Sequence, residues 1–258
     1  PPFGKKSSVT IVNDAGETVP VAHACGHDLH ATWLIGTATV LAAHQDRWTG
    51  RLVLVVQPAE EIGTGADAMI DDGLFERFGT PTVALGQHVV PSPAGTVLHR
   101  SGPIMAASDA LKITLHGHGG HGSSPQTTVD PVVMAASTVM KLQTIVSRGL
   151  DPSATAVVTV GTLHAGTKEN IIPDTAELSL SVRTFDPAVR DRVLGSIERI
   201  AEGEAASYGA PKPPDVDSLY SFPVTENDPT ATELVARAFD AHFGPDRSLP
   251  APLATGSE

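Results

Sequence analysis

Apolar residues in the first hundred positions occur in short continuous runs rather than in alternation with polar residues. The run 51–56, Arg-Leu-Val-Leu-Val-Val, is rich in β-branched residues and lies between a glycine and a proline, and 82–86 is a second such run. We also expect a short buried strand over 20–24. Strands that are apolar on both faces need cover on both faces, so these runs predict a mainly parallel sheet.

Helical segments separate these runs. A helix that begins at Asp28, whose side chain can cap it, is expected to reach about His44, and a second helix fits residues 65–74. Strands that alternate with helices of this length are typical of an α/β domain with helices on both faces of its sheet.

The pattern changes at about residue 107. The elements predicted from there are strand 110–115, helix 130–148, strands 154–163 and 176–184, helix 187–208 and strand 216–220. This β-α-β-β-α-β order is that of a ferredoxin-like α+β domain. A further amphipathic helix over 228–243 is expected to return to the first domain. The sequence therefore predicts a domain of residues 107–216 inserted into a larger one made of 1–106 and 217–258.

Composition and charge exclude several classes of protein. Of the 258 residues, 41% are hydrophobic and 18% charged, which is a globular composition. The formal net charge of −12 argues against a nucleic-acid partner, and no apolar run reaches the roughly 18 residues of a membrane span. The single cysteine cannot form an intramolecular disulfide, so a cytoplasmic location is expected.

The eleven histidines are unevenly distributed, and several lie around the lone Cys25. In an extended segment, residues two apart point the same way, so Cys25 and His27 can converge on one ion. A thiolate and an imidazole are good ligands for zinc and related ions. Asp28 is placed either to cap the following helix or to orient a metal-binding histidine. An inert buried cysteine among surface histidines is the alternative.

Further polar side chains follow the next two predicted strands. Glu60 and Glu61 come after 51–56, and His88 comes after 82–86. Because open α/β sheets place their sites at the carboxyl ends of strands, we expect these side chains to meet Cys25 and His27. Adjacent side chains point apart, so one carboxylate can bind metal while the other acts as general base; a solvated acidic loop is the alternative. This number of ligands makes a two-metal site plausible.

A second group of histidines, His116, His118 and His121, lies in a glycine-rich stretch of the inserted domain. Glycines at these positions let an imidazole and backbone N–H groups approach a ligand closely. A flexible loop tip without a role is the alternative.

Taken together, these residues resemble the M20 family of metallopeptidases. The resemblance is to its amidohydrolase branch, which includes hippurate hydrolases, N-acyl-amino-acid amidohydrolases and indole-acetyl-amino-acid hydrolases. The matching stretches, in the family's order, are His-Ala-Cys-Gly-His-Asp (23–28), Gln-Pro-Ala-Glu-Glu (57–61), Gly-Gln-His-Val (86–89), Gly-Gly-His-Gly-Ser-Ser-Pro (119–125), Asp-Pro (130–131), Asn-Ile-Ile-Pro (170–173) and Val-Arg-Thr (182–184).

The resemblance implies a zinc-peptidase-like catalytic domain whose Glu60 is the general base. The metal ligands that it implies are Cys25, His27, Glu61 and His88. They would hold a divalent metal, expected as two ions, among which zinc, manganese, cobalt and nickel are not distinguished. The resemblance also implies that the chain is truncated at both ends, lacking segments before residue 23 and a last histidine ligand after Glu258, which makes activity of this chain doubtful.

For the inserted domain the resemblance implies a lid that also forms a homodimer. Its His121 would reach the active site of the partner subunit and polarise the scissile carbonyl or stabilise the oxyanion. Asn170 would lie near the substrate. Arg183 would bind a substrate carboxylate, unless it is an ordinary exposed strand residue.

The function expected from these residues is that of a metal-dependent amidohydrolase. It would cleave the amide bond of an N-acyl amino acid or short peptide with a metal-activated water. One alternative is a hydrolase with Cys25 as nucleophile and a histidine as base. Another is a non-catalytic module for dimerisation or binding.

Overall fold

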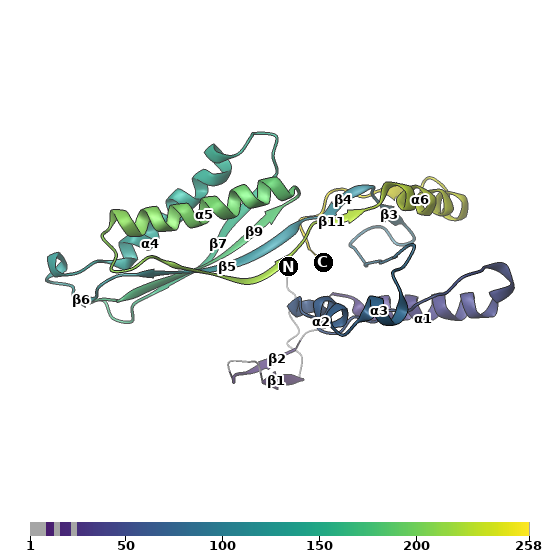
Figure 1. The fold of residues 1–258 in the computed structure, drawn as a ribbon, viewed down its shortest axis with the longest axis horizontal. Coiled ribbons are helices and arrows are strands. Elements are labelled where there is room, and N and C mark those ends of the chain that lie inside the picture. The colour runs from purple at the N-terminus through teal and green to yellow at the C-terminus, as the bar shows by residue number, and fades with distance from the viewer. Residues whose placement is uncertain (1–8, 13–15, 22–24, 258) are drawn as a thin grey trace. The chain divides into compact units, whose positions relative to one another are not determined.

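The computed structural model describes residues 9–12, 16–21 and 25–257. The chain divides into two compact units, Pro1–Ala94 and Gly95–Glu258, and Figure 1 shows the elements of each. None of the helices in residues 9–12, 16–21 and 25–257 combines the length and the hydrophobicity that a membrane span requires.

The first unit contains short strands and helices. They are β1 (Thr10–Val12), β2 (Thr18–Pro20), α1 (His27–Ala43), the 3-10 turns Gln45–Arg47 and Glu60–Ile62, α2 (Gly65–Asp71) and α3 (Leu74–Phe78). Strands β1 and β2 pair antiparallel. Of the strand expected over 20–24, Pro20 is the last residue of β2 and Val21 lies outside any strand, whereas residues 22–24 lie outside the described residues.

Helix α1 begins one residue earlier than expected. Its N-cap is Gly26, which has φ 83° and ψ 21°, in the left-handed region that glycine adopts easily. Asp28 is therefore not the capping residue; it lies in the first turn, where a negative charge interacts favourably with the helix dipole. The expected helix over 65–74 is also different, because Gly73 with φ 84° separates α2 from α3.

The two apolar runs of the first unit do not form strands in this structure. Neither 51–56 nor 82–86 is paired with another strand, and Leu54 and Val56 are 44% and 74% exposed. A β-branched run becomes a strand only where a neighbour satisfies its backbone N–H and C=O groups. The parallel sheet predicted from these runs is therefore absent from the described part of the unit.

The second unit is built on a four-stranded antiparallel sheet with the order β10-β5-β9-β7. Its strands are β5 (Ala107–His116), β7 (Ala156–Ala165), β9 (Thr175–Thr184) and β10 (Asp215–Phe222). Helices α4 (Pro131–Thr144) and α5 (Pro187–Ser207) cover the same face of this sheet (Figure 1). With the short β6 (Gly120–His121) and β8 (Ile171–Ile172) set aside, the element order is β-α-β-β-α-β, as the apolar pattern predicts.

Local signals define the helices of this unit. Asp130 caps α4 by accepting hydrogen bonds from Val132 N and Val133 N, and Asp186 caps α5 through Val189 N. In both helices a proline follows the cap, at the position where its missing N–H costs nothing. The apolar faces of both helices pack on the sheet in one core, which includes Ile113, Leu115, Met134, Leu142, Leu178, Val182, Val193 and Ile197.

The other elements of the second unit lie at the far end of β5 from β6 (Figure 1). They are β3 (Val97–His99), β4 (Gly102–Met105), β11 (Thr225–Asn227), α6 (Pro229–Phe243) and β12 (Ser248–Pro250). Two turns lie elsewhere in the unit, the 3-10 turn Pro125–Thr127 and the π turn Ile145–Gly149. Strand β4 pairs antiparallel with β11. Strand β3 pairs parallel with β12, the only parallel pair of named strands in the described part of the chain.

Candidate metal centre

Five predicted ligand and base residues come together in the first unit. Their ligand atoms form two groups, Cys25 with His27 and His88, and His27 with Glu60 and Glu61, and within each group the atoms lie within 4.8 Å of one another. One thiol, two imidazoles and two carboxylates are donors that suit zinc and similar divalent ions. The residues therefore fit a metal centre, and His27 belongs to both groups.

The individual contacts are short. Cys25 Sγ lies 3.3 Å from His88 Nε2. His27 Nε2 lies 3.4 Å from a carboxylate oxygen of Glu60 and 3.7 Å from one of Glu61. The Glu60 side chain is 27% exposed and that of Glu61 68%, so the two carboxylates differ in burial. They do not point apart, because Glu60–Ile62 is a 3-10 turn rather than an extended segment, and both reach the same His27 nitrogen.

The turn before α1 brings Cys25 and His27 to the segment that carries His88. Gly26 is in the left-handed conformation, and a Cβ atom at this position would lie 2.4 Å from Val89 Cγ1. Side chains larger than hydrogen are thus opposed both by the backbone conformation and by the close packing of Val89. The glycine between the two predicted ligands therefore has a structural reason.

The ring of His88 is oriented by the main chain of its neighbour. Its Nδ1 lies 2.6 Å from the carbonyl oxygen of Val89. A carbonyl oxygen only accepts, so Nδ1 carries the proton and donates it. In the neutral ring, Nε2 then keeps its lone pair and faces Cys25 Sγ. This is the tautomer that a metal-binding imidazole needs.

His30 is a member of the cluster to which the sequence pattern attaches no role. Its ring centroid lies 4.4 Å from that of His88 and 5.3 Å from that of His27, and it stacks on Trp33 at 5.7 Å. Burial, with the neighbouring rings of His88 and His27, lowers the pKa of His30. A signal for it exists in the sequence, because residues three apart on a helix, such as His27 and His30, lie on one face.

His121 and Asn170, predicted to contact substrate, lie side by side in the second unit. His121 lies on β6, which pairs with β8 directly after Asn170, and Gly122 N donates to the carbonyl of Asn170 at 2.8 Å. His121 Nδ1 accepts from Ser123 N at 3.2 Å. The neutral ring therefore carries its proton on Nε2, which is the form that can donate a hydrogen bond to a carbonyl oxygen.

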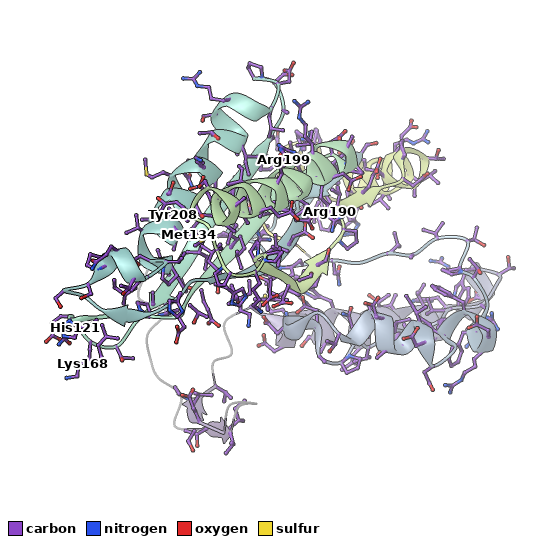
Figure 2. All side chains as sticks on the ribbon, turned by 60° about the vertical axis from the view of Figure 1, so that its left-hand side comes forward. His121, Met134, Lys168, Arg190, Arg199 and Tyr208 are labelled. Atoms are coloured by element: carbon purple, nitrogen blue, oxygen red, sulfur yellow. The ribbon has the colours of Figure 1, made fainter. Side chains whose placement is uncertain are left out.

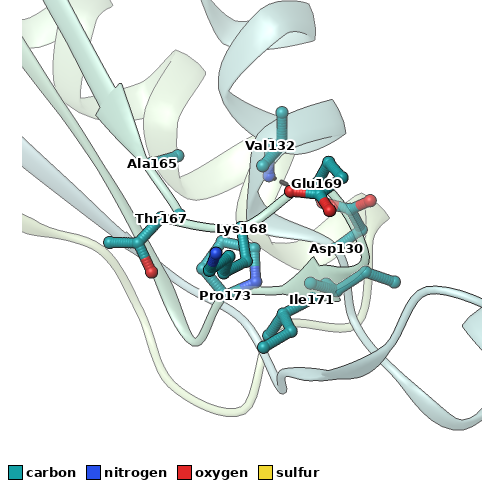
Figure 3. A pocket seen from close by; sticks show the side chains of 10 residues that line it. Asp130, Val132, Ala165, Thr167, Lys168, Glu169, Ile171 and Pro173 are labelled. Atoms are coloured by element: carbon teal, nitrogen blue, oxygen red, sulfur yellow. Dashed lines mark hydrogen bonds between the residues drawn. The ribbon is translucent and has the colours of Figure 1, made fainter.

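A cavity of about 490 Å³ lies next to this pair, lined by residues that include Asp130, Lys168, Glu169 and Ile171 (Figure 3). Ile171 is also the pairing partner of His121 between β6 and β8. Figure 2 shows His121 and Lys168 at the same end of the second unit. The end of the sheet that bears the glycine-rich loop thus offers space and polar side chains.

Arg183 is not brought to that end of the sheet. It lies near the other end of β9, eight residues and roughly 26 Å along the strand from Thr175. Its Nη1 donates to Ser257 Oγ at 2.8 Å. Within one chain, Arg183 and Asn170 therefore lie too far apart to contact the same small substrate.

His116, the first histidine of the second group, contacts the neighbouring strand β10. Its Nε2 lies 2.7 Å from Asp215 Oδ2, which links the end of β5 to the start of β10. The hydrogen bond from His116 lowers the pKa of Asp215, and Lys212 adds to the effect. The contact gives His116 a structural role at the base of the glycine-rich loop.

Comparison with known proteins identifies the group to which these residues belong. Residues 5–258 match peptidase family M20/M25/M40. The chain belongs to this family. As a member of family M20, it is 39% identical over 221 residues to thermostable carboxypeptidase 2 of Saccharolobus solfataricus, an alignment that covers 84% of this chain and 55% of the relative.

Two further proteins are similar over most of the chain. Hippurate hydrolase of Campylobacter jejuni is 39% identical over 225 residues, covering 87% of this chain and 57% of the relative. The solved structure of the Bacillus subtilis YXEP protein, a dinuclear metal-binding peptidase of the family, matches with a TM-score of 0.72 and 30% identity, covering 100% of this chain and 63% of that one. The chain thus spans little more than half the length of the curated relatives that it matches.

Proposed function

We propose that this chain carries the metal centre of an amidohydrolase that cleaves N-acyl amino acids or short peptides. The observation that supports this most is the pair of ligand groups that share His27. The proposal also draws on the relatives, among which are a hippurate hydrolase and a carboxypeptidase. Both names denote hydrolysis of an amide bond next to a free carboxylate.

In this proposal Cys25, His27, Glu61 and His88 bind divalent ions, two when the site is full. Such ions, when bound, lower the pKa of water from about 15.7 towards 7 and polarise a carbonyl oxygen. The relationship to a dinuclear metal-binding peptidase supports the number two. The donor set suits zinc, manganese, cobalt and nickel alike, with the thiolate of Cys25 favouring the softer ions.

Glu60 is the general base of the proposed reaction. Its carboxylate takes the proton from the attacking water and then passes it to the leaving nitrogen. Glu60 and Glu61 lie at similar distances from His27 Nε2, so the division of roles between them rests on the family resemblance. Asp28, in the first turn of α1, is proposed to orient a histidine of the centre.

His121 is proposed to stabilise the oxyanion, with Asn170 beside it. The Nε2–H that follows from the Ser123 contact is the donor this role requires. Arg183 is proposed to bind a substrate carboxylate. Because Arg183 and Asn170 lie at opposite ends of the sheet, the two are proposed to act in different active sites of a homodimer, whose lid domain is 107–216 and whose catalytic domain is 1–106 with 217–258.

The edge strand β7 supports the homodimer. It is a ten-residue edge with no aspartate, glutamate, lysine or arginine, whereas the opposite edge strand β10 carries Asp215 and Asp217. Exposed sheet edges are ordinarily blunted by charge, because their free N–H and C=O groups pair with other chains. The uncharged edge is the one that we propose pairs with a second copy.

The decisive experiment compares Glu60→Gln with Glu61→Gln. Two quantities are measured: the rate of hydrolysis of a panel of N-acyl amino acids, and the bound metal, by elemental analysis. Both are measured for this chain and for an enzyme completed with the segments of a relative. Glu60→Gln is expected to keep its metal and to lose turnover at least about 100-fold, whereas Glu61→Gln is expected to lose metal. Glu76→Gln, at an exposed position of α3, is the control that should change neither. Full turnover of Glu60→Gln would refute the assignment.

The contact of Cys25 with His88 at 3.3 Å favours one second candidate, a hydrolase with a cysteine nucleophile. The carboxylates next to His27 have no task in that reaction. A chelator separates the two candidates: inhibition that added metal reverses supports the metal centre, and activity unaffected by chelation supports the thiol. A folded dimer without bound metal would instead support a non-catalytic module.

A further inference from the structure

The backbone of Val89 is hydrogen-bonded on both sides within the candidate metal centre. Its N–H donates to His30 Nε2 at 3.0 Å, and its carbonyl oxygen accepts from His88 Nδ1 at 2.6 Å. Its side chain packs against Gly26, at the start of α1. One residue thus joins the helix that carries His27 to the ring of His88.

The two hydrogen bonds determine which nitrogen carries the proton in each ring. A backbone N–H only donates, so His30 Nε2 must accept, and the neutral His30 ring then carries its proton on Nδ1. A carbonyl only accepts, so His88 carries its proton on Nδ1 as well. The lone pair of His30 Nε2 is thereby used within the protein, whereas His88 Nε2 faces Cys25 Sγ.

His30 is well placed to hold this arrangement. It lies on the first turn of α1, its ring stacks on Trp33, and it contacts the His88 ring edge to face at 4.4 Å. The position of its Nε2 is therefore set by a helix and by an aromatic neighbour. A rigid acceptor at this point holds the N–H of Val89, and the packing of the Val89 side chain at Gly26 holds the same residue from another side. The residue whose carbonyl accepts from His88 Nδ1 is therefore held at two points.

We infer that His30 is a positioning residue that acts through Val89 to orient His88 for metal binding. The inference rests on the proposed function, since it deepens the account of the same centre. In this inference His30 does not bind the ions itself, although its place beside His88 and His27 suggests a metal ligand at first sight. The orienting chain runs from His30 to the Val89 backbone and from there to the imidazole of His88.

The first test is made on the metal-free wild-type chain. Two-dimensional NMR of ¹⁵N-histidine-labelled protein distinguishes the two neutral tautomers, and His30 and His88 are assigned with His30→Gln and His88→Gln. Both rings are expected in the Nδ1–H form. An Nε2–H form of either ring overturns the inference, as does direct coordination of added zinc by His30 Nε2. This readout is independent of turnover and of metal binding by the variants.

The second test compares two substitutions of His30 by cobalt titration, followed through the thiolate-to-cobalt absorption band. His30→Phe keeps an aromatic ring next to Trp33 but removes the acceptor, and is expected to bind cobalt about 10-fold more weakly. His30→Gln places an amide oxygen near the position of Nε2 and is expected to restore most of the affinity. His44→Gln, at the exposed C-terminal end of α1, is the matched control.

Three results of the titration contradict the inference: unchanged affinity in His30→Phe, a His30→Gln variant as weak as His30→Phe, or an equal loss in the His44→Gln control. Circular dichroism establishes that each variant is folded. If His30→Phe does not fold, the tautomers of the wild-type chain still decide. If the wild-type chain binds no cobalt, the proposed function fails. The tautomers of His30 and His88 then still test the role of His30 independently.

Discussion

The two units of the chain are built differently. In the second unit, helices α4 and α5 pack on one face of a four-stranded sheet and enclose a continuous apolar core. Among the residues of the first unit whose burial is described, Gly65 is the one that is buried. The first unit contains the candidate metal ligands, and their contacts are polar. The densely packed unit and the unit with the metal-binding side chains are therefore different parts of the chain.

This difference indicates different sources of stability. Burying a large aliphatic or aromatic side chain contributes about 1.5–3 kcal/mol, and the second unit does so repeatedly. The first unit holds imidazoles, a thiol and carboxylates close together. Bound cations would compensate the carboxylates that lie next to one another there. We therefore expect the second unit to depend on its core and the first on its metal.

The largest expected effect is that of a core truncation. Leu178→Ala removes a side chain that is fully buried in β9 and is expected to destabilise the second unit by about 2–5 kcal/mol. Leu54→Ala, at a 44% exposed position of the first unit, is the matched control and is expected to cost less than about 1 kcal/mol. Native-state hydrogen exchange measures each unit separately. Equal losses in the two variants would contradict the proposed difference between the units.

Metal addition should act on the opposite unit. At a free concentration of 100 times its Kd, a metal ion that binds only the folded unit stabilises it by about 2.7 kcal/mol. Hydrogen exchange is expected to slow in α1 and around residues 59–62, and not in β5 or β9. A chelator should reverse the effect, and Cys25→Ser should weaken it. Slower exchange only in the sheet would show that the metal binds elsewhere.

An ion pair between the buried Glu204 and the exposed Lys141 gives the next expected effect, again in the second unit. Burial raises the pKa of Glu204, but hydrogen bonds from Lys141 and Ser137 outweigh it, and the pKa is lowered on balance. Because the folded-state pKa lies below that of the unfolded chain, this stabilisation is present above the ordinary glutamate pKa and is lost as the pH falls through the folded value.

Lys141→Met leaves the Glu204 carboxylate buried without its cation. It is expected to cost about 1–3 kcal/mol at pH 7. The difference from the wild type should shrink as the pH falls below the ordinary glutamate pKa and vanish once it passes the lowered folded-state pKa of Glu204. Denaturation followed by hydrogen exchange across this pH range measures it. Lys168→Met, at an exposed position, should show no such pH dependence. A pH-independent loss would mean that Lys141 stabilises by packing alone.

The smallest expected loss of stability comes from two glycines of the first unit. Gly26 and Gly16 have φ of 83° and 78°, and a Cβ would meet Val89 at the first but nothing within 4 Å at the second. Alanine at either position should cost about 1–2 kcal/mol from backbone strain. Only Gly26→Ala should also weaken cobalt binding. A similar loss of affinity in Gly16→Ala would show that strain alone, and not the contact with Val89, affects the centre.

The second unit could be predicted from sequence because its signals are local. An aspartate followed by proline marks the start of α4, α5 and α6, and apolar periodicity marks their buried faces. Helix α4 still ends at Thr144 rather than at Arg148, because the chain continues as a π turn over Ile145–Gly149. In the first unit the apolar runs predicted strands, but a strand also requires a neighbouring chain, which composition does not reveal.

The candidate site was predictable in part from the sequence. Spacing and position after apolar runs indicated that the five predicted ligand and base residues would meet, and the structure brings them together. His30 was missed because its hydrogen bond goes to the main chain of Val89, a partner that no side-chain pattern marks. The separation of Arg183 from Asn170 depends on the direction of β9, which residue types do not encode.

The central strand β5 also has a consequence for how the chain folds. It is synthesised before both of its neighbours, yet pairs with β9 at Leu111 and Leu180 and with β10 at Thr114 and Asp215. These pairings join residues far apart in the chain, and such long-range contacts slow folding because the intervening loop must first close. During translation both edges of β5 are therefore unpaired until β9 has been synthesised. If the ribosome pauses before β10, one edge of β5 stays exposed and can pair with another nascent chain.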